Sequence, residues 1–268
     1  MIGAVASGGI VLALAAGDPT GTPGTQQLGG ANRVLELRQY KIVPGKRDEF
    51  IALFEDRFIE SQEALGMRLV GQFRDRDDPD RFTWIRSFTD MDSRRKELNA
   101  FYFGPVWKAN RDRANPMLDD NDNVLLLRPA SPELAFAPSA ERPKRGAATV
   151  PAKSVVAAIE YLWKSPDQGF TSFFRDELVP ALSDCGLTVV AAYVPEEAEN
   201  NFPRLPVRSD RKILVWFATA PNGTSLDRAL HKLEQESETK SAIAKLRAFE
   251  ERRPQILRLE PTHRSALR

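Results

Sequence analysis

The chain has 268 residues, enough for one or two domains with a buried core. Charged residues make up 28% and hydrophobic residues 42% of it, a balance typical of a globular protein in water. The net charge of +1 offers no basic excess for a nucleic-acid partner, and the single cysteine, Cys185, excludes an internal disulfide.

Residues 1–32 differ in composition from the rest of the chain. Their apolar run, 10–16, is too short to span a bilayer and is similar to the core of a signal peptide, with an Ala13-x-Ala15 cleavage pattern. The positively charged stretch that normally precedes such a core is missing. Residues 17–32 are rich in Gly, Thr and Pro and predict a linker. We expect an exported protein, periplasmic or extracellular, with no membrane span; a cytoplasmic protein with an apolar tail is the alternative.

From residue 33 onward the apolar pattern predicts the order strand, helix, strand, strand, helix, strand. Residues 34–43 alternate as in a strand, and a helix with Phe50, Phe54 and Phe58 at helical spacing follows the Pro-Gly turn. The later elements are strands over 66–75 and 81–88, a helical region from Met91 broken near Gly104-Pro105, and a strand over 123–130.

The second half of the chain repeats this pattern at a fixed offset. Adding 120 pairs Gly66 with Gly186, and after the second strand an offset of 132 pairs Trp84 with Trp216. The extra residues that lengthen the offset from 120 to 132 fall in the loop PEEAENNFPRLPVRSD. A duplication of this kind is a stronger signal than any single propensity.

The repeat predicts two domains within one chain. We expect an α+β fold in which two tandem ferredoxin-like βαββαβ units cover each other's open sheet face and form an α/β barrel, a pseudo-dimer. A homodimer of the whole chain stays possible. The expected segments are a first domain over 33–129, a linker over 130–153, a second domain over 154–262 and a tail over 263–268.

Polar residues share one face of the first predicted strand. Glu36, Arg38 and Tyr40 alternate there with Leu35 and Leu37. We expect Leu35 and Leu37 to face the helices, and the polar set to point into the barrel lumen.

The third predicted strand adds Trp84 and Arg86 to this face. Charges that face a closed lumen are costly unless they are paired or bind a ligand. One interpretation is an ion network of Glu36, Arg38 and Arg86 that braces the two sheets, with the aromatic residues as ordinary core. Another is a ligand pocket whose guanidinium groups suit a carboxylate, a phosphate or an enolate. A wrong assignment of the two faces is the third possibility.

The second half has lost most of this polar set. Its charged positions are occupied by Val156, Ala158 and Ala218. Glu160 takes the place of Tyr40, and only the tryptophan persists, as Trp216. A bracing network would be expected in both halves, so the asymmetry favours one site, contributed mainly by the first half, with Glu160, Trp163 and Trp216 as candidate walls.

Aromatic residues follow the third strand. Phe101, Tyr102 and Trp107 are candidates to cap one end of the lumen, and ordinary packing on the sheet is the alternative. Arg94 and Arg95 are expected to face solvent.

The sequence lacks the motifs of several other kinds of functional site. The chain has two histidines, His231 and His263, without paired Cys/His spacing, so no metal site is expected. A glycine-rich phosphate loop and a GxSxG nucleophile motif are also missing.

The stretches LELRQYKIVPGKRDEF, LVGQF and FTWIRSFTDMDSRRK together resemble the NIPSNAP family over residues 33–128. This resemblance implies the dimeric α/β-barrel superfamily, with the second half similar to the divergent partner domain of two-domain bacterial members. The family's recurrent positions correspond to Glu36, Arg38, Tyr40, Trp84, Arg86 and Arg94.

The superfamily includes cofactor-free monooxygenases, heme proteins, isomerases and simple binding proteins. Its heme enzymes use a helix histidine, which the first half lacks, although His231 lies on the analogous helix of the second half. We therefore expect no cofactor.

Three functions remain open at this point. The first is binding of a small anionic or aromatic molecule, with Arg38, Arg86 and Tyr40 orienting it and Trp84 stacking on it. The second is a cofactor-independent monooxygenase or isomerase, with Tyr40 or Glu36 as acid and base and an arginine stabilising an enolate-like charge. The third is a non-catalytic module for protein interaction.

Overall fold

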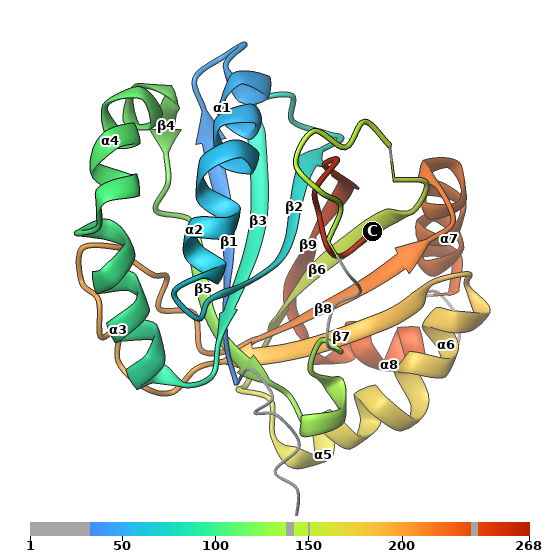
Figure 1. Ribbon diagram of the computed structural model, residues 1–268. Helices are drawn as coiled ribbons and strands as arrows, with labels where there is room; N and C mark the ends of the chain where they lie inside the picture. The colour runs from blue at the N-terminus through green and yellow to red at the C-terminus, as the bar shows by residue number, and fades with distance from the viewer. Residues whose placement is uncertain (1–32, 138–141, 150, 237–240) are drawn as a thin grey trace, which may run out of the picture. The chain divides into compact units, whose positions relative to one another are not determined.

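The computed structural model describes residues 33–137, 142–149, 151–236 and 241–268 (Figure 1). The predicted export segment, 1–32, lies outside the described residues. No helix in the described ranges is long and apolar enough to cross a membrane.

The elements of the first half follow the predicted order, with the first helix and the helical region each divided. They are β1 (Val34–Ile42), α1 (Arg47–Leu53), the π-helix η1 (Phe54–Phe58), α2 (Ile59–Glu63), β2 (Arg68–Asp75), β3 (Arg81–Phe88), α3 (Met91–Tyr102), α4 (Pro105–Ala114), the 3-10 helix η2 (Asn115–Met117), β4 (Leu118–Asp120) and β5 (Val124–Pro129). Gly104 precedes Pro105 at the start of α4, which explains the break between α3 and α4.

The second half repeats the series after the 3-10 helix η3 (Pro132–Leu134). Its elements are β6 (Ser154–Leu162), α5 (Gln168–Phe173), the π-helix η4 (Phe174–Leu178), α6 (Val179–Asp184), β7 (Thr188–Pro195), β8 (Ile213–Ala220), α7 (Gly223–Glu236), α8 (Ala242–Phe249) and β9 (Glu250–Pro261).

Eight strands close into one antiparallel barrel. Their order is β3-β2-β9-β6-β8-β7-β5-β1, and the pairing of β1 with β3 completes the ring, while the short β4 joins the end of β1. The pairs β2–β9 and β5–β7 join the two halves. This arrangement confirms the predicted α+β fold, with two tandem units forming an intrachain barrel.

The backbone itself shows the repeat. The π-helices η1 and η4 begin 120 residues apart, and so do the bulges that follow Leu69 and Val189. Gly66 and Gly186 lie in the turns that follow α2 and α6 and have positive φ, +109° and +98°. Only glycine adopts such angles without strain, which explains why the same residue type stands at both turns.

The lumen of the barrel is filled by apolar side chains from both halves. Leu35, Leu37 and Ile85 form one buried cluster with Val155 and Ala157 of the second half. The prediction that Leu35 and Leu37 face the helices is therefore wrong, and the polar set does not line the lumen.

The two faces are exchanged relative to that prediction for a physical reason. The luminal face of each half must fit the luminal face of the other, in a space closed to water, where charged side chains would be most costly. The opposite face is covered by that half's own helices, whose polar side chains can pair with charges. Tyr40 and Trp84 accordingly lie in a cluster with Phe50, Phe54 and Phe58 of α1 and η1.

Parts of the linker and of the tail pack against the barrel. Phe136 and Leu267 contact the luminal cluster. Arg142 donates to Gln72 Oε1 at 3.2 Å and to Glu63 Oε1 at 2.7 Å. These contacts bring residues before and after the second half to the same end of the barrel.

Candidate functional site

Glu36 on β1 is enclosed by three guanidinium groups on the helix-facing side of the sheet. Its Oε2 accepts hydrogen bonds from Arg38 Nη1 and Arg86 Nε, each at 2.7 Å, and its Oε1 accepts one from Arg94 Nε at 2.8 Å. All four side chains are fully buried. The Nη2 groups of Arg86 and Arg94 also lie 2.7 Å from Glu36, without the angles of hydrogen bonds, and add ion-pair contact.

This cluster carries more positive than negative charge. Burial alone raises the pKa of Glu36, but attraction to Arg86, Arg94 and Arg38 outweighs burial and holds that pKa well below its usual range. Glu36 is therefore ionised. Within the described ranges it is the one carboxylate at salt-bridge distance from these arginines, so the formal charge of the cluster is +2.

Tyr40 lies at the edge of the cluster. Arg38 Nε donates to Tyr40 Oη at 2.9 Å, and the guanidinium carbon of Arg38 lies 5.3 Å from the Tyr40 ring centroid and 5.5 Å from that of Trp84. Burial raises the pKa of the Tyr40 phenol, and Arg38 offsets only part of that rise. The phenol therefore keeps its proton. Because its oxygen already accepts a hydrogen bond, its O–H group is available as a donor.

Amide side chains accept further hydrogen bonds from the guanidinium groups of Arg86 and Arg94. Arg86 Nη1 donates to Gln62 Oε1 at 2.9 Å, and Arg94 Nη1 donates to Asn200 Oδ1 at 3.1 Å and Asn201 Oδ1 at 2.8 Å. The prediction that Arg94 faces solvent is wrong, because this side chain points from α3 into the cluster, whereas Arg95 is exposed as expected.

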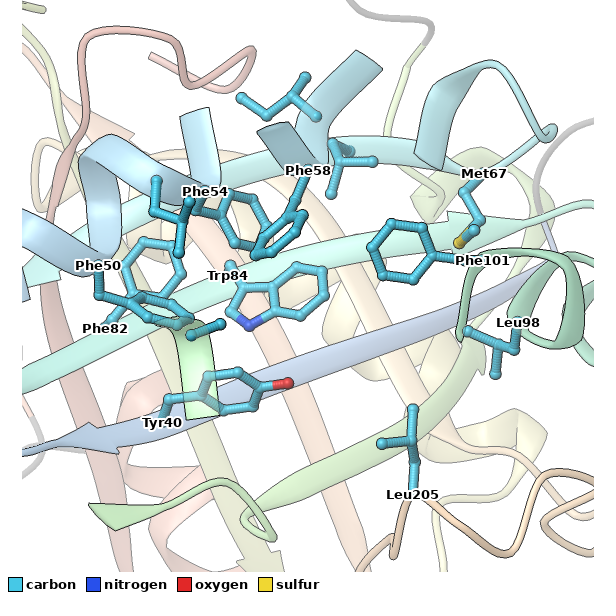
Figure 2. Close-up of a cluster of buried hydrophobic side chains, with 14 of the residues drawn as sticks. Tyr40, Phe50, Phe54, Phe58, Met67, Phe82, Trp84, Leu98, Phe101 and Leu205 are labelled. Carbon is cyan, nitrogen blue, oxygen red and sulfur yellow. The ribbon is translucent and has the colours of Figure 1, made fainter. Parts of the chain in front are cut away.

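A cavity of about 220 Å³ lies above Tyr40 and Trp84, beneath the helices of the first half. Figure 2 shows Trp84 between Tyr40 on one side and Phe54 and Phe58 on the other, with ring centroids 5.7 Å from Tyr40 and 4.9 Å from Phe54. The further lining residues include Phe101, Tyr102, Trp107 and Gln62. An apolar cavity of about 150 Å³ holds benzene, so this volume suits one or two fused rings.

The remaining wall of this cavity comes from the second half. The β7–β8 loop places Phe202 in a stacked contact with Tyr102, with 5.8 Å between ring centroids, and Leu205 joins the same apolar cluster. Arg204 of this loop lines the cavity. The insertion in the second repeat, predicted only as a loop, therefore completes the cavity of the first.

One buried donor of the cavity lining, Trp84 Nε1, has no hydrogen-bond partner in the part of the chain that the structure describes. Unsatisfied buried donors are uncommon in proteins. Together with the Tyr40 O–H group, it forms a pair of donors that suits an acceptor carrying negative charge.

The predicted site residues divide into three groups. Tyr40, Trp84, Phe101 and Trp107 line the cavity. Glu36, Arg38 and Arg86 lie one layer behind it and hold Tyr40 and Gln62 in place. Trp216 lies on the outer face of β8, where it lines a different cavity of the second half together with Glu160. Trp163 is exposed and lines neither cavity.

Sequence reasoning missed several residues of the site. Gln62 stands on the face of α2 toward the sheet, four residues after Phe58 in the same helical stripe, so helical spacing could have revealed it. Asn200, Asn201, Phe202 and Arg204 lie in an insertion without periodicity, and no pattern in the sequence indicates which half they contact. The described residues include no cluster of His, Cys, Asp and Glu that could hold a metal ion.

Comparisons with known proteins agree with this architecture. Residues 35–132 match the NIPSNAP family, and no curated protein matches the chain. A structure described as a "putative monooxygenase" from Lactobacillus acidophilus NCFM is 11% identical, covers 86% of this chain and 94% of its own, and has a TM-score of 0.55. An "anthrone oxidase-like protein" is also 11% identical, with 88% and 94% coverage and a TM-score of 0.52.

A NIPSNAP domain protein from Burkholderia xenovorans is 24% identical, covers 39% of this chain and 98% of its own, and has a TM-score of 0.34. The two long matches show that the whole barrel, and not only its first half, has a known architecture. Residues 35–132 of this chain form a NIPSNAP family domain, the first unit of a two-unit α/β barrel.

Proposed function

We propose that the first half binds a small aromatic molecule that carries an anionic group. The ring occupies the cavity beneath α1–α4, and the anionic group meets the donors of Tyr40 and Trp84. The observation that carries this proposal is the buried excess of guanidinium charge directly behind an aromatic cavity whose floor holds an unpartnered donor. The lumen is filled, so the ligand lies on the outer face of the sheet.

The cluster supplies a field as well as hydrogen bonds. A surplus of positive charge in a dry environment attracts an anion more strongly than the same charge in water. Arg38 polarises the Tyr40 O–H group by donating to its oxygen, so Tyr40 is the strongest neutral donor at the cavity. Each hydrogen bond to a charged acceptor stabilises a complex by about 1.5–3 kcal/mol.

The rim of the cavity suits the same ligand. Arg111 on α4 and Arg204 on the β7–β8 loop line the cavity and are exposed. Such exposed cations increase the local concentration of an approaching anion. The aromatic walls then select for a flat ring, since edge and face contacts are possible on several sides.

Calorimetric titration with three ligands that share one ring system tests this proposal. The probes are 1-naphthoate, the neutral 1-naphthalenemethanol and the cationic 1-naphthylmethylamine. We expect affinity to fall in that order. Tyr40→Phe should weaken 1-naphthoate about tenfold or more, because it removes a hydrogen bond to a charged group, and should affect the alcohol less.

The matched control is Tyr193→Phe, which removes a buried phenol of the lumen whose oxygen accepts from Phe136 N at 3.1 Å. It should leave the affinity for 1-naphthoate unchanged. Equal affinity for the acid and the alcohol, or an unchanged affinity in Tyr40→Phe, would overturn the proposal.

A cofactor-independent monooxygenase or isomerase is the second candidate. It is favoured by the placement of the Tyr40 phenol, a group able to donate and accept a proton, against an aromatic cavity with Arg38 at its oxygen. Oxygen uptake with anthrone, which consumes one O2 and forms anthraquinone and water, tests the oxidative version. Uptake above the spontaneous rate that falls in Tyr40→Phe would support catalysis. Tight 1-naphthoate binding without uptake would support binding alone.

A further inference from the structure

We propose that the second half contains a separate site for an apolar amine, in the cavity between the outer face of the sheet and helices α7 and α8, with Glu160 as the partner of the ammonium group. The cavity measures about 710 Å³. Its apolar lining includes Leu182, Leu230, Leu233, Ile243, Leu246 and Ile256. This site is independent of the function proposed for the first half.

Glu160 is the innermost polar group of the cavity. Its side chain is 1% exposed, and Oε1 accepts a hydrogen bond from Trp216 Nε1 at 2.8 Å. Oε2 accepts no hydrogen bond from another side chain within the described ranges, and the carboxyl group of Glu250 is its hydrogen-bonding neighbour. Arg247 Nη1 is 3.8 Å from it, beyond hydrogen-bond distance. Two neighbouring carboxyl groups, with no cation within hydrogen-bond distance of Glu160 Oε2, therefore border an apolar cavity.

The groups around Glu160 leave a deficit of positive charge. Glu250 on β9 forms an ion pair with Arg247 on α8, so that guanidinium is already engaged. Burial, a hydrogen bond to Glu250 and repulsion by the Glu250 charge raise the pKa of Glu160 to about 8, although Trp216 and Arg247 oppose the rise. Glu160 is thus protonated near neutral pH, because ionisation would give this inner group a net negative charge.

The rim adds His231 and Glu234 from α7 and Arg253 from β9, all exposed. The other rim cation, Arg258, pairs with Asp77 and Asp227. An ammonium group at Glu160 Oε2 would take the place of the acid proton and keep the inner group neutral, and an alkyl chain would cover the leucine and isoleucine walls. A carboxylate ligand would meet two carboxyl groups, and a neutral alcohol would gain a hydrogen bond without charge pairing.

Calorimetric titration of the whole chain with n-hexylamine, beside n-hexanol as the uncharged match, tests this site. The titration is run at about pH 7 in two buffers of different ionisation enthalpy. We expect hexylamine to bind with release of about one proton, because the arriving ammonium ion drives Glu160 to ionise. Hexanol should bind more weakly and release none. Near pH 9, where Glu160 is ionised and hexylamine is still mostly charged, the proton release should disappear.

Glu160→Gln should weaken hexylamine at least about tenfold and abolish the proton release, while leaving hexanol unchanged. The matched control is Glu177→Gln, which removes an exposed carboxylate of the same half that pairs with Lys245 outside the cavity; it should behave like the wild type. Leu230→Trp narrows the cavity without touching Glu160 and should weaken both ligands, which locates the site even if Glu160→Gln folds poorly.

The proposal is overturned if hexylamine fails to bind the wild type or binds no better than hexanol, or if it binds without proton release near neutral pH. Binding that survives both Glu160→Gln and Leu230→Trp would place the amine elsewhere and would also overturn it.

Discussion

Tyr40 in the first half and Glu160 in the second half occupy equivalent positions, 120 residues apart, on strands that pair in the same register with a tryptophan-bearing strand. Arg38 lies opposite Trp84 on β1 and β3, and Ala158 lies opposite Trp216 on β6 and β8. The first position sits in a cluster with surplus positive charge, and the second is a carboxyl group with too few cations around it.

This difference shows which face of the barrel accepts variation in charge. The luminal face of each half must fit the other half, and both carry apolar residues there. The outer face meets only its own helices and the loops above them, so its polar residues can differ as long as each is paired locally. Opposite charges on one scaffold would let two cavities of one chain take ligands of opposite charge.

The largest expected difference in stability is between the variants Glu36→Gln and Glu160→Gln. Glu36→Gln leaves three buried guanidinium groups without a counter-charge and places an amide N–H group against them, so we expect a loss of about 3–5 kcal/mol in the free energy of unfolding. Glu160→Gln resembles the protonated acid and can still accept from Trp216, so its cost near neutral pH should be below about 1 kcal/mol. Urea denaturation of both variants measures the contrast, and similar losses would contradict it.

The two carboxyl groups should also respond to pH in opposite directions. The pKa of Glu160 is raised to about 8 from an ordinary 4.5, so the stability it contributes is full below about 4.5 and is lost as pH rises toward 8. The pKa of Glu36 is lowered from 4.5, so its contribution is present above that value and is lost in acid. Relative to Glu160→Gln, the wild type should therefore become less stable between about pH 4.5 and pH 8. A constant difference in unfolding free energy over this range would refute the assignment.

Replacing each of the two tryptophans by phenylalanine should give a smaller difference in stability. Trp84 Nε1 has no hydrogen-bond partner in the described ranges, whereas Trp216 Nε1 donates to Glu160. Both Trp→Phe substitutions lose similar packing, but Trp216→Phe also leaves a buried carboxyl oxygen without its donor. We expect it to cost about 1 kcal/mol more than Trp84→Phe. Thermal unfolding of the two variants side by side decides this, and a larger loss for Trp84→Phe would count against the site geometry.

The smallest expected difference in stability is between substitutions at the two equivalent glycines, Gly66 and Gly186. Gly66→Ala and Gly186→Ala should each cost about 1–2 kcal/mol because φ is positive at both. An added Cβ at Gly66 would lie 2.5 Å from Glu97 Oε1, while at Gly186 it would find Ala229 Cβ at 3.9 Å. Gly66→Ala should therefore be the more destabilising, by less than about 1 kcal/mol. Chemical denaturation in which Gly186→Ala is the worse variant would contradict this reading of the two turns.

The repeat made most of the fold predictable. Alternation along 34–43, helical spacing of the phenylalanines and the offset between Trp84 and Trp216 depend on local chain geometry, which sequence records directly. The two π-helices were not predicted, because a single widened turn keeps nearly the same apolar spacing as an α-helix.

The residues of the first site were also identified from sequence, but the direction in which they point was not. Alternation divides Glu36 from Leu35 without stating which face meets the helices. Both faces of this strand are buried, so the usual polar-out rule gave no answer. The contribution of Asn200, Asn201 and Phe202 depends on a loop of one half reaching the other, a contact that no local pattern encodes.

The central claim, that the first half binds an anionic aromatic ligand outside the barrel lumen, is tested most directly by a crystal structure of the protein with 1-naphthoate. We predict the ring between Trp84 and Trp107, with the carboxylate within hydrogen-bond distance of Tyr40 Oη and Trp84 Nε1. A ligand found in the lumen or beside Glu160, or an empty first cavity at saturating 1-naphthoate, would contradict the account.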